Sequence, residues 1–102
     1  FVFPSTVETF GNPLVEAMAC GAPIASSNTA AMPEVLGDAA VYFDPNNVEN
    51  ITEVLLELYN DPDARSGLTS KARRRADLYA WQKTKKRTLD VIRDPVGAVA
   101  VK

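Results

Sequence analysis

The chain of 102 residues is 46% hydrophobic and 24% charged, the balance of one soluble globular domain rather than of a fibrous or disordered chain. Its apolar stretches are shorter than the roughly 18 residues of a membrane-spanning helix. One cysteine and no histidine exclude an internal disulfide, a histidine–cysteine metal site and a histidine general base within these residues. Residues 1–64 carry ten acidic and no basic side chains, whereas residues 65–102 carry eleven basic and three acidic ones. We therefore expect the two halves to have different roles.

Three short apolar segments predict strands, at residues 1–3, 22–26 and 40–43. Pro4 ends the first segment, and the second leads into a polar loop at residues 27–29.

A helix is predicted between the first two strands. Asn12 is a preferred N-cap, Pro13 suits the first helical position, and Gly21 is placed for a left-handed helix end. A shorter helical turn is predicted over residues 32–36, before the third strand.

The remaining sequence has a helical pattern. Asn46 and Glu49 have the spacing of a capping box, Asp61 followed by Pro62 is typical of a second helix start, and a third helix is predicted over about residues 81–94. Side chains sharing one face are Val48, Ile51, Leu55, Leu58 and Tyr59 in the first helix, Leu68, Ala72, Ala76 and Tyr79 in the second, and Trp81, Lys85, Thr88, Leu89 and Ile92 in the third.

The order of these elements is that of an α/β doubly wound unit with parallel strands. Three strands are too few for a complete sheet of this type, and residue 1 is a Phe that already belongs to a strand segment. We therefore expect a partial Rossmann-like sheet with trailing helices, in a chain that is a fragment of a longer enzyme. Residues 95–102 are expected to form a short tail.

Glu16 is the most informative residue because it stands among apolar residues of the first predicted helix. A buried carboxylate needs partners, and the hydroxyl groups of a ligand would supply them. The helix pattern leaves a second interpretation open, in which Glu16 lies on one exposed stripe or accepts a hydrogen bond from a backbone amide near the helix start.

Glu8 lies in the loop that leaves the first strand, where open α/β sheets bind ligands, although a solvated loop carboxylate is the alternative. Gly11 would let the backbone approach a ligand, and free amides at the following helix start favour anions or sugar oxygens. The spacing Glu8-x7-Glu16, with Phe10 and Gly11 between, is more specific than either carboxylate alone. No Lys or Arg precedes Arg65, so cations for a diphosphate would have to come from elsewhere.

Residues 4–23, PSTVETFGNPLVEAMACGAP, resemble the Glu-x7-Glu signature segment of family 4 (group 1) glycosyltransferases, retaining GT-B enzymes that use nucleotide-sugars. Further segments similar to later blocks of that family are residues 28–32, 33–35, 37–39 and 43–45, together with Trp81 and its helix. The resemblance covers about residues 1–94. It implies the C-terminal half of a GT-B C-terminal, nucleotide-sugar-binding domain.

The resemblance also implies roles for individual residues. In that family the first glutamate holds hydroxyls of the transferred sugar and the second holds the ribose, which assigns these roles to Glu8, as the catalytic residue, and to Glu16. Backbone amides around Thr9, Phe10 and Gly11 would face the sugar and diphosphate of the donor. The donor would be a nucleoside diphosphate sugar such as GDP-mannose or UDP-glucose, with no cofactor and no metal.

The implied function is hexose transfer, with retention, to a hydroxyl of a carbohydrate or lipid-linked acceptor in polysaccharide biosynthesis. The diphosphate cations, the base-binding loop and the N-terminal acceptor domain have no counterpart in these residues, so the chain alone is expected to be inactive. A nucleotide-binding GT-B relative without transferase activity is the alternative.

Basic side chains form two clusters on the last two predicted helices, at residues 71–75 and 83–87. A solvated helix face is the usual explanation, and a docking module for a partner or for an anionic membrane surface is the alternative. We expect no nucleic-acid partner because the acidic half would repel a phosphate backbone. The expected location is cytoplasmic, and the membrane alternative places the protein at the inner face of a membrane.

Overall fold

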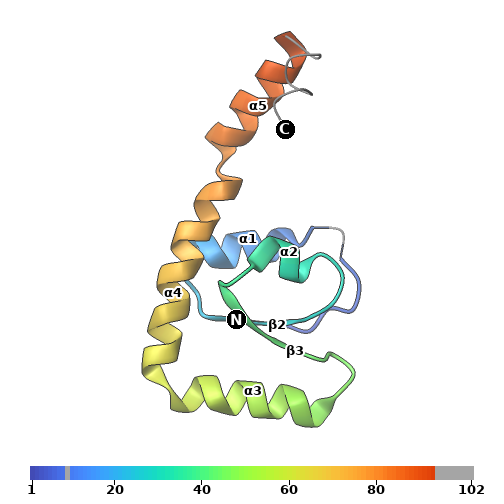
Figure 1. The fold of residues 1–102 in the computed structure, drawn as a ribbon, viewed down its shortest axis with the longest axis vertical. Coiled ribbons are helices and arrows are strands. Elements are labelled where there is room, and N and C mark those ends of the chain that lie inside the picture. Colours follow the sequence, from blue (N-terminus) through green and yellow to red (C-terminus); the bar gives the residue numbers. More distant parts are fainter. Residues whose placement is uncertain (9, 94–102) are drawn as a thin grey trace.

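The computed structural model describes residues 1–8 and 10–93 (Figure 1). A parallel sheet in the order β1-β2-β3 lies at its centre. The strands are β1 (Val2–Phe3), β2 (Ile24–Ser27) and β3 (Ala40–Phe43). The predicted parallel α/β arrangement is confirmed.

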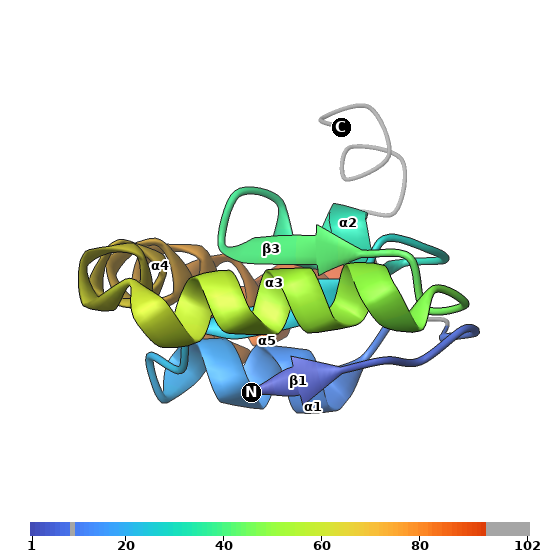
Figure 2. The ribbon, with the colours of Figure 1, turned by 90° about the horizontal axis from the view of Figure 1, so that it is seen from below.

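Helices cover both faces of the sheet. α1 (Asn12–Ala19) and α2 (Met32–Leu36) lie on one face, and α3 (Val48–Asn60) lies on the other (Figures 1 and 2). This three-layer arrangement is that of a doubly wound α/β unit.

α4 (Pro62–Ala76) runs from α3 back toward α1, against which it packs (Figure 1). Asp61 caps it as predicted, because its carboxylate accepts a hydrogen bond from the Ala64 amide at 3.0 Å. Leu68 and Ala72 are buried, which confirms this part of the predicted inner face, whereas Ala76 is only partly buried and Tyr79 lies beyond the end of the helix.

η1 (Asp77–Tyr79) leads into α5 (Trp81–Arg93), which extends away from the sheet (Figure 1). Leu89 and Ile92 of α5 are exposed, so the predicted apolar side of this helix has no cover from the described residues. The predicted tail, residues 95–102, lies outside the described residues.

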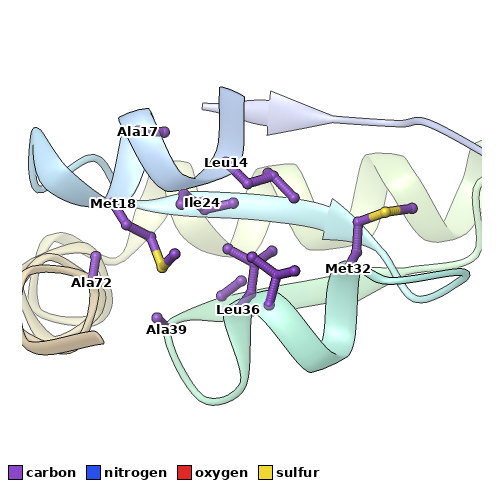
Figure 3. Packing of buried hydrophobic residues seen from close by; sticks show 10 residues of the cluster. Leu14, Ala17, Met18, Ile24, Met32, Leu36, Ala39 and Ala72 are labelled. Atoms are coloured by element: carbon purple, nitrogen blue, oxygen red, sulfur yellow. The ribbon is translucent and has the colours of Figure 1, made fainter. Parts of the chain in front are cut away.

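The hydrophobic core lies between the sheet and the layer of α1 and α2 (Figure 3). Leu14 and Met18 of α1, Ile24 of β2, Leu36 of α2 and Ala72 of α4 are all fully buried in it. Burial of each Leu, Ile or Met side chain stabilises the fold by roughly 1.5–3 kcal/mol. The cluster therefore holds α1 in one position on the sheet.

The start of α1 differs from the prediction. Gly11, rather than Asn12, is the N-cap, and its carbonyl accepts a hydrogen bond from the Leu14 amide at 2.9 Å. Gly11 has φ 88°, in the left-handed region that favours glycine, and a Cβ there would lie 3.0 Å from Leu14 Cδ1. The Asn12 N-cap is wrong because this glycine turns the chain into the helix one residue earlier.

The end of α1 is as predicted. Gly21 has φ 72° and its amide donates to the Met18 carbonyl at 2.9 Å, while the Ala22 amide donates to the Ala17 carbonyl at 3.0 Å. This pair of bonds forms a Schellman motif. Because Ala22 completes the helix end and Pro23 has no amide, β2 begins two residues later than predicted.

The capping box predicted at Asn46 is wrong by one residue. The Asn47 side chain accepts from the Asn50 amide at 3.0 Å, whereas the Asn46 amide donates to the Asp44 carboxylate at 2.9 Å. Asp44 uses that amide to close the turn that ends β3, so α3 starts after Asn47.

The face of α3 predicted to be buried is covered only in its middle. Ile51, Leu55 and Leu58 are partly buried, but Val48 and Tyr59 are 77% and 78% exposed. A 13-residue helix spans about 20 Å, whereas the four-residue strand β3 beneath it spans about 13 Å. Both ends of the helix therefore extend beyond the strand.

The C-terminal end of α2 is closed by side chains from α4 and η1. Arg75 donates through Nε to the Val35 carbonyl and through Nη2 to the Glu34 carbonyl, both at 2.7 Å. Tyr79 also donates to the Val35 carbonyl, at 3.1 Å. These carbonyls have no partner within so short a helix, so Arg75 connects the basic half of the chain to the layer of α1 and α2.

Arg75→Ala should lower the free energy of unfolding by about 2–3 kcal/mol, because two hydrogen bonds from a partly buried cation are lost. Arg74→Ala is the matched control, since Arg74 is exposed on the same helix, and its effect should stay within about 0.5 kcal/mol. Urea unfolding followed by circular dichroism measures both. Equal losses in the two variants would contradict the role of Arg75.

Gly11→Ala should destabilise the chain by about 1–2 kcal/mol, because an L side chain is forced into the left-handed region beside Leu14. Gly67→Ala should instead stabilise the chain by about 0.5–1 kcal/mol, since Gly67 lies inside α4 and a Cβ added there would meet no other atom within 4 Å. Thermal unfolding of the two variants measures both changes in stability. If both substitutions stabilised the chain, the backbone at Gly11 would not be constrained to the left-handed region.

Candidate functional site

The carboxyl ends of β1 and β2 meet at one edge of the sheet because the strands are parallel. Residues 4–8, 10 and 11 lie between β1 and α1, and residues 28–31 follow β2. The predicted site residues Glu8, Phe10, Gly11 and Glu16 belong to the first of these segments and to α1. Thr9 lies outside the described residues.

Glu8 is half-buried in the loop after β1. Its Oε1 atom lies 3.4 Å from the Ser5 hydroxyl, which also lies 3.0 Å from the Val7 carbonyl oxygen. The Ser5 carbonyl in turn accepts a hydrogen bond from the Ser27 hydroxyl at 2.5 Å. Glu8 is therefore part of a turn that is tied to β2, rather than a freely solvated carboxylate.

Phe10 and Gly11 fix the second half of the loop. The Phe10 ring packs edge to face against Tyr79, with ring centroids 5.4 Å apart, and Gly11 is buried. The Asn12 amide, at the first helical position, has no acceptor within α1, and Pro13 carries no amide. The start of α1 thus offers an amide and the positive end of the helix dipole to an oxygen ligand.

Glu16 is exposed on α1, whereas Leu14 and Met18 on the same helix are buried. Of the two interpretations left open by the sequence, the exposed stripe is confirmed and the buried carboxylate is wrong. The apolar composition of this helix was misleading because Val15 is only partly buried and Ala19 is exposed. An exposed carboxylate can accept hydrogen bonds from ligand hydroxyls without losing a protein partner.

Ser26 and Ser27 end β2 and are fully buried. The polar loop predicted to begin at Ser27 therefore begins one residue later, since Ser27 pairs with Phe43 of β3. Thr29 lies two residues beyond Ser27, and its Oγ1 is buried without a hydrogen-bond partner in the part of the chain that the structure describes. Sequence reasoning missed the burial of Ser27, although its place directly after an apolar strand segment was a signal for it.

Basic side chains gather at the opposite edge of the sheet, where β3 begins. Lys71, Arg74 and Arg75 line an open pocket of about 270 Å³ there, together with Asp38. Burial raises the pKa of the nearby Tyr42 hydroxyl, which donates a hydrogen bond to the Gly37 carbonyl. The edge that carries Glu8 has no Lys or Arg in the segments between β1 and α3.

Within residues 1–8 and 10–93, no group of three or more His, Cys, Asp or Glu side chains could hold a metal ion. The helices of this same part are too short or too polar to cross a membrane.

Known proteins share both the sequence and the fold. The family model for "Glycosyl transferases group 1" matches residues 1–75. The chain is similar to "O-antigen chain mannosyltransferase B" of Escherichia coli, with 38% identity over 90 residues, which cover 88% of this chain and 24% of that protein. It is also 38% identical over 101 residues to "MMP alpha-(1->4)-mannosyltransferase" of Mycolicibacterium hassiacum, covering 95% of this chain and 25% of that one. The chain spans about a quarter of the length of these relatives.

Among solved structures, sucrose-phosphate synthase from Thermosynechococcus elongatus matches with a TM-score of 0.85 and 24% identity, over 95% of this chain and 25% of that one. This match confirms the expected fold, a parallel α/β sheet with helices like that in the GT-B fold of this neighbour. The family model covers residues 4–23, whose sequence carried the resemblance. The chain therefore belongs to the group 1 family of glycosyltransferases.

Proposed function

We propose that the chain is the donor-binding part of a retaining glycosyltransferase, which transfers a hexose from a nucleoside diphosphate sugar to an acceptor hydroxyl. The placement of Glu8 and Glu16 supports this most strongly. Glu8 follows β1 at the edge where parallel α/β sheets bind ligands, and Glu16 lies about one turn into α1, the next helix. Two similar proteins are named mannosyltransferases, which favours GDP-mannose over UDP-glucose as the donor. The O-antigen relative favours a carbohydrate or lipid-linked acceptor.

Glu16 and Glu8 divide the donor between them in this proposal. The exposed Glu16 carboxylate on α1 accepts hydrogen bonds from the two ribose hydroxyls. The half-buried Glu8 accepts hydrogen bonds from hydroxyls of the hexose. The diphosphate faces the start of α1, where the amides around Phe10 and Gly11 and the helix dipole favour an anion.

In this proposal the chain positions the donor and supplies the Glu8 carboxylate beside the reacting sugar, where an oxocarbenium-like state develops. Cations for the departing diphosphate, the base-binding loop and the acceptor domain come from outside these 102 residues. By themselves the 102 residues are therefore expected to transfer no sugar.

Glu16→Ala in the intact enzyme should weaken binding of the nucleoside diphosphate by about 2–4 kcal/mol, because two charge-assisted hydrogen bonds to ribose are lost. Calorimetric titration with GDP and UDP measures this loss. Glu57→Ala is the control, since Glu57 is also an exposed helical carboxylate but lies on α3, across the sheet. Unchanged affinity in Glu16→Ala would reject the ribose role.

Glu8→Gln keeps the size of the side chain and removes its charge. We expect nucleoside diphosphate affinity within about threefold of the parent, and a loss of turnover of at least about a hundredfold, as for other positioned groups that stabilise transition-state charge. Steady-state kinetics at saturating GDP-mannose, combined with GDP titration, separate the two quantities. Weaker GDP binding with turnover preserved at saturation would show that Glu8 only shapes the nucleotide site.

A further inference from the structure

We infer that Ser27 is a positioning residue for Glu8: its hydroxyl holds the turn from Ser5 to Glu8 against the carboxyl end of β2. This inference rests on the proposed role of Glu8 at the transferred sugar.

The backbone ladder between β1 and β2 ends just before this turn. The last pair is Phe3 with Ser26, and the next residue, Pro4, has no amide to continue the pairing. Ser27 is the next residue of β2, and its hydroxyl donates to the Ser5 carbonyl at 2.5 Å. A side chain thus replaces the backbone link that Pro4 cannot make.

The turn beyond this anchor leads directly to Glu8. The Ser5 hydroxyl has one proton and two acceptors, the Val7 carbonyl oxygen at 3.0 Å and Glu8 Oε1 at 3.4 Å, so the bond to Val7 is the stronger. That bond closes the turn, and the longer contact brings the Glu8 carboxylate against it. The position of Glu8 therefore depends on where the Ser5 backbone is held.

The Ser27 hydroxyl is buried on an apolar strand, and its hydrogen bond is to the loop after β1. The residue is fully buried, and Ile24 and Ala25 on the same strand are buried apolar residues. A buried hydroxyl costs free energy unless it is hydrogen-bonded, and the Ser27 hydroxyl is bonded to the loop that carries Glu8. A displacement of about 1 Å in a positioned catalytic group can lower turnover about a hundredfold.

Ser27→Ala in the intact enzyme tests this, with Ser26→Ala as the matched control. Ser26 is equally buried on the same strand, but its hydroxyl donates to the neighbouring Ser27 carbonyl at 3.1 Å and not to the loop. For Ser27→Ala we expect kcat with GDP-mannose to fall at least about tenfold, while KM and the affinity for GDP change less than about threefold. Ser26→Ala should keep kcat within about twofold, and Ser27→Thr, which retains the hydroxyl, should recover most of it. Equal kcat values in the two alanine variants would overturn the inference.

A double-mutant cycle shows whether Ser27 acts through Glu8. In the Glu8→Gln background, Ser27→Ala should lower kcat by less than about twofold, because the carboxylate that it positions is already gone. The same tenfold loss in both backgrounds would overturn the inference and leave the proposed function intact. Full turnover in Glu8→Gln itself would remove the proposed role of Glu8, and the role of Ser27 with it.

Discussion

The packing of α1 against β2 determines where each residue of the candidate site lies. Leu14 and Met18 of α1 are buried in the same cluster as Ile24 of β2, so the helix can sit on the sheet in only one rotation. That rotation exposes Glu16, and it sets the start of α1 after a left-handed Gly11 at the carboxyl edge of the sheet. The loop that carries Glu8 has to bridge from β1 to this helix start, and its two ends are therefore fixed.

Much of the fold could be predicted from local rules. Residues 32–36 and 40–43 form the predicted helix and strand without change, and Gly21 ends α1 as expected. In each case a short-range requirement decides the structure, such as a left-handed residue at a helix end or a run of apolar residues in a strand.

Other errors arise where a different element of the chain decides. The ends of α3 are exposed because β3, which lies beneath this helix, is short. The misplaced cap of α3 is a local error instead: the Asp44 carboxylate, at the end of β3, accepts a hydrogen bond from the Asn46 amide and closes the turn there. The burial of Ser27 depends on β3 beside it and on the loop after β1, and the residues around Ser27 indicate it only through the apolar segment that precedes it.

The uneven charge of the chain has partly a structural explanation. The acidic half carries the Glu8-x7-Glu16 spacing of the candidate site. In the basic half, Arg75 is occupied by the carbonyls at the end of α2, so part of the basic cluster on α4 stabilises the fold and is not free to dock a partner. In the proposed function, the cations that a donor diphosphate requires come from outside this chain.

The proposed function requires that one donor molecule extends from Glu16 to Glu8 along the loop and the start of α1. A crystal structure of the intact enzyme with GDP-mannose tests this most directly. We expect the Glu16 carboxylate within hydrogen-bond distance of both ribose hydroxyls, and the mannose hydroxyls beside Glu8. A donor bound at another edge of the sheet, with both carboxylates in solvent, would contradict it.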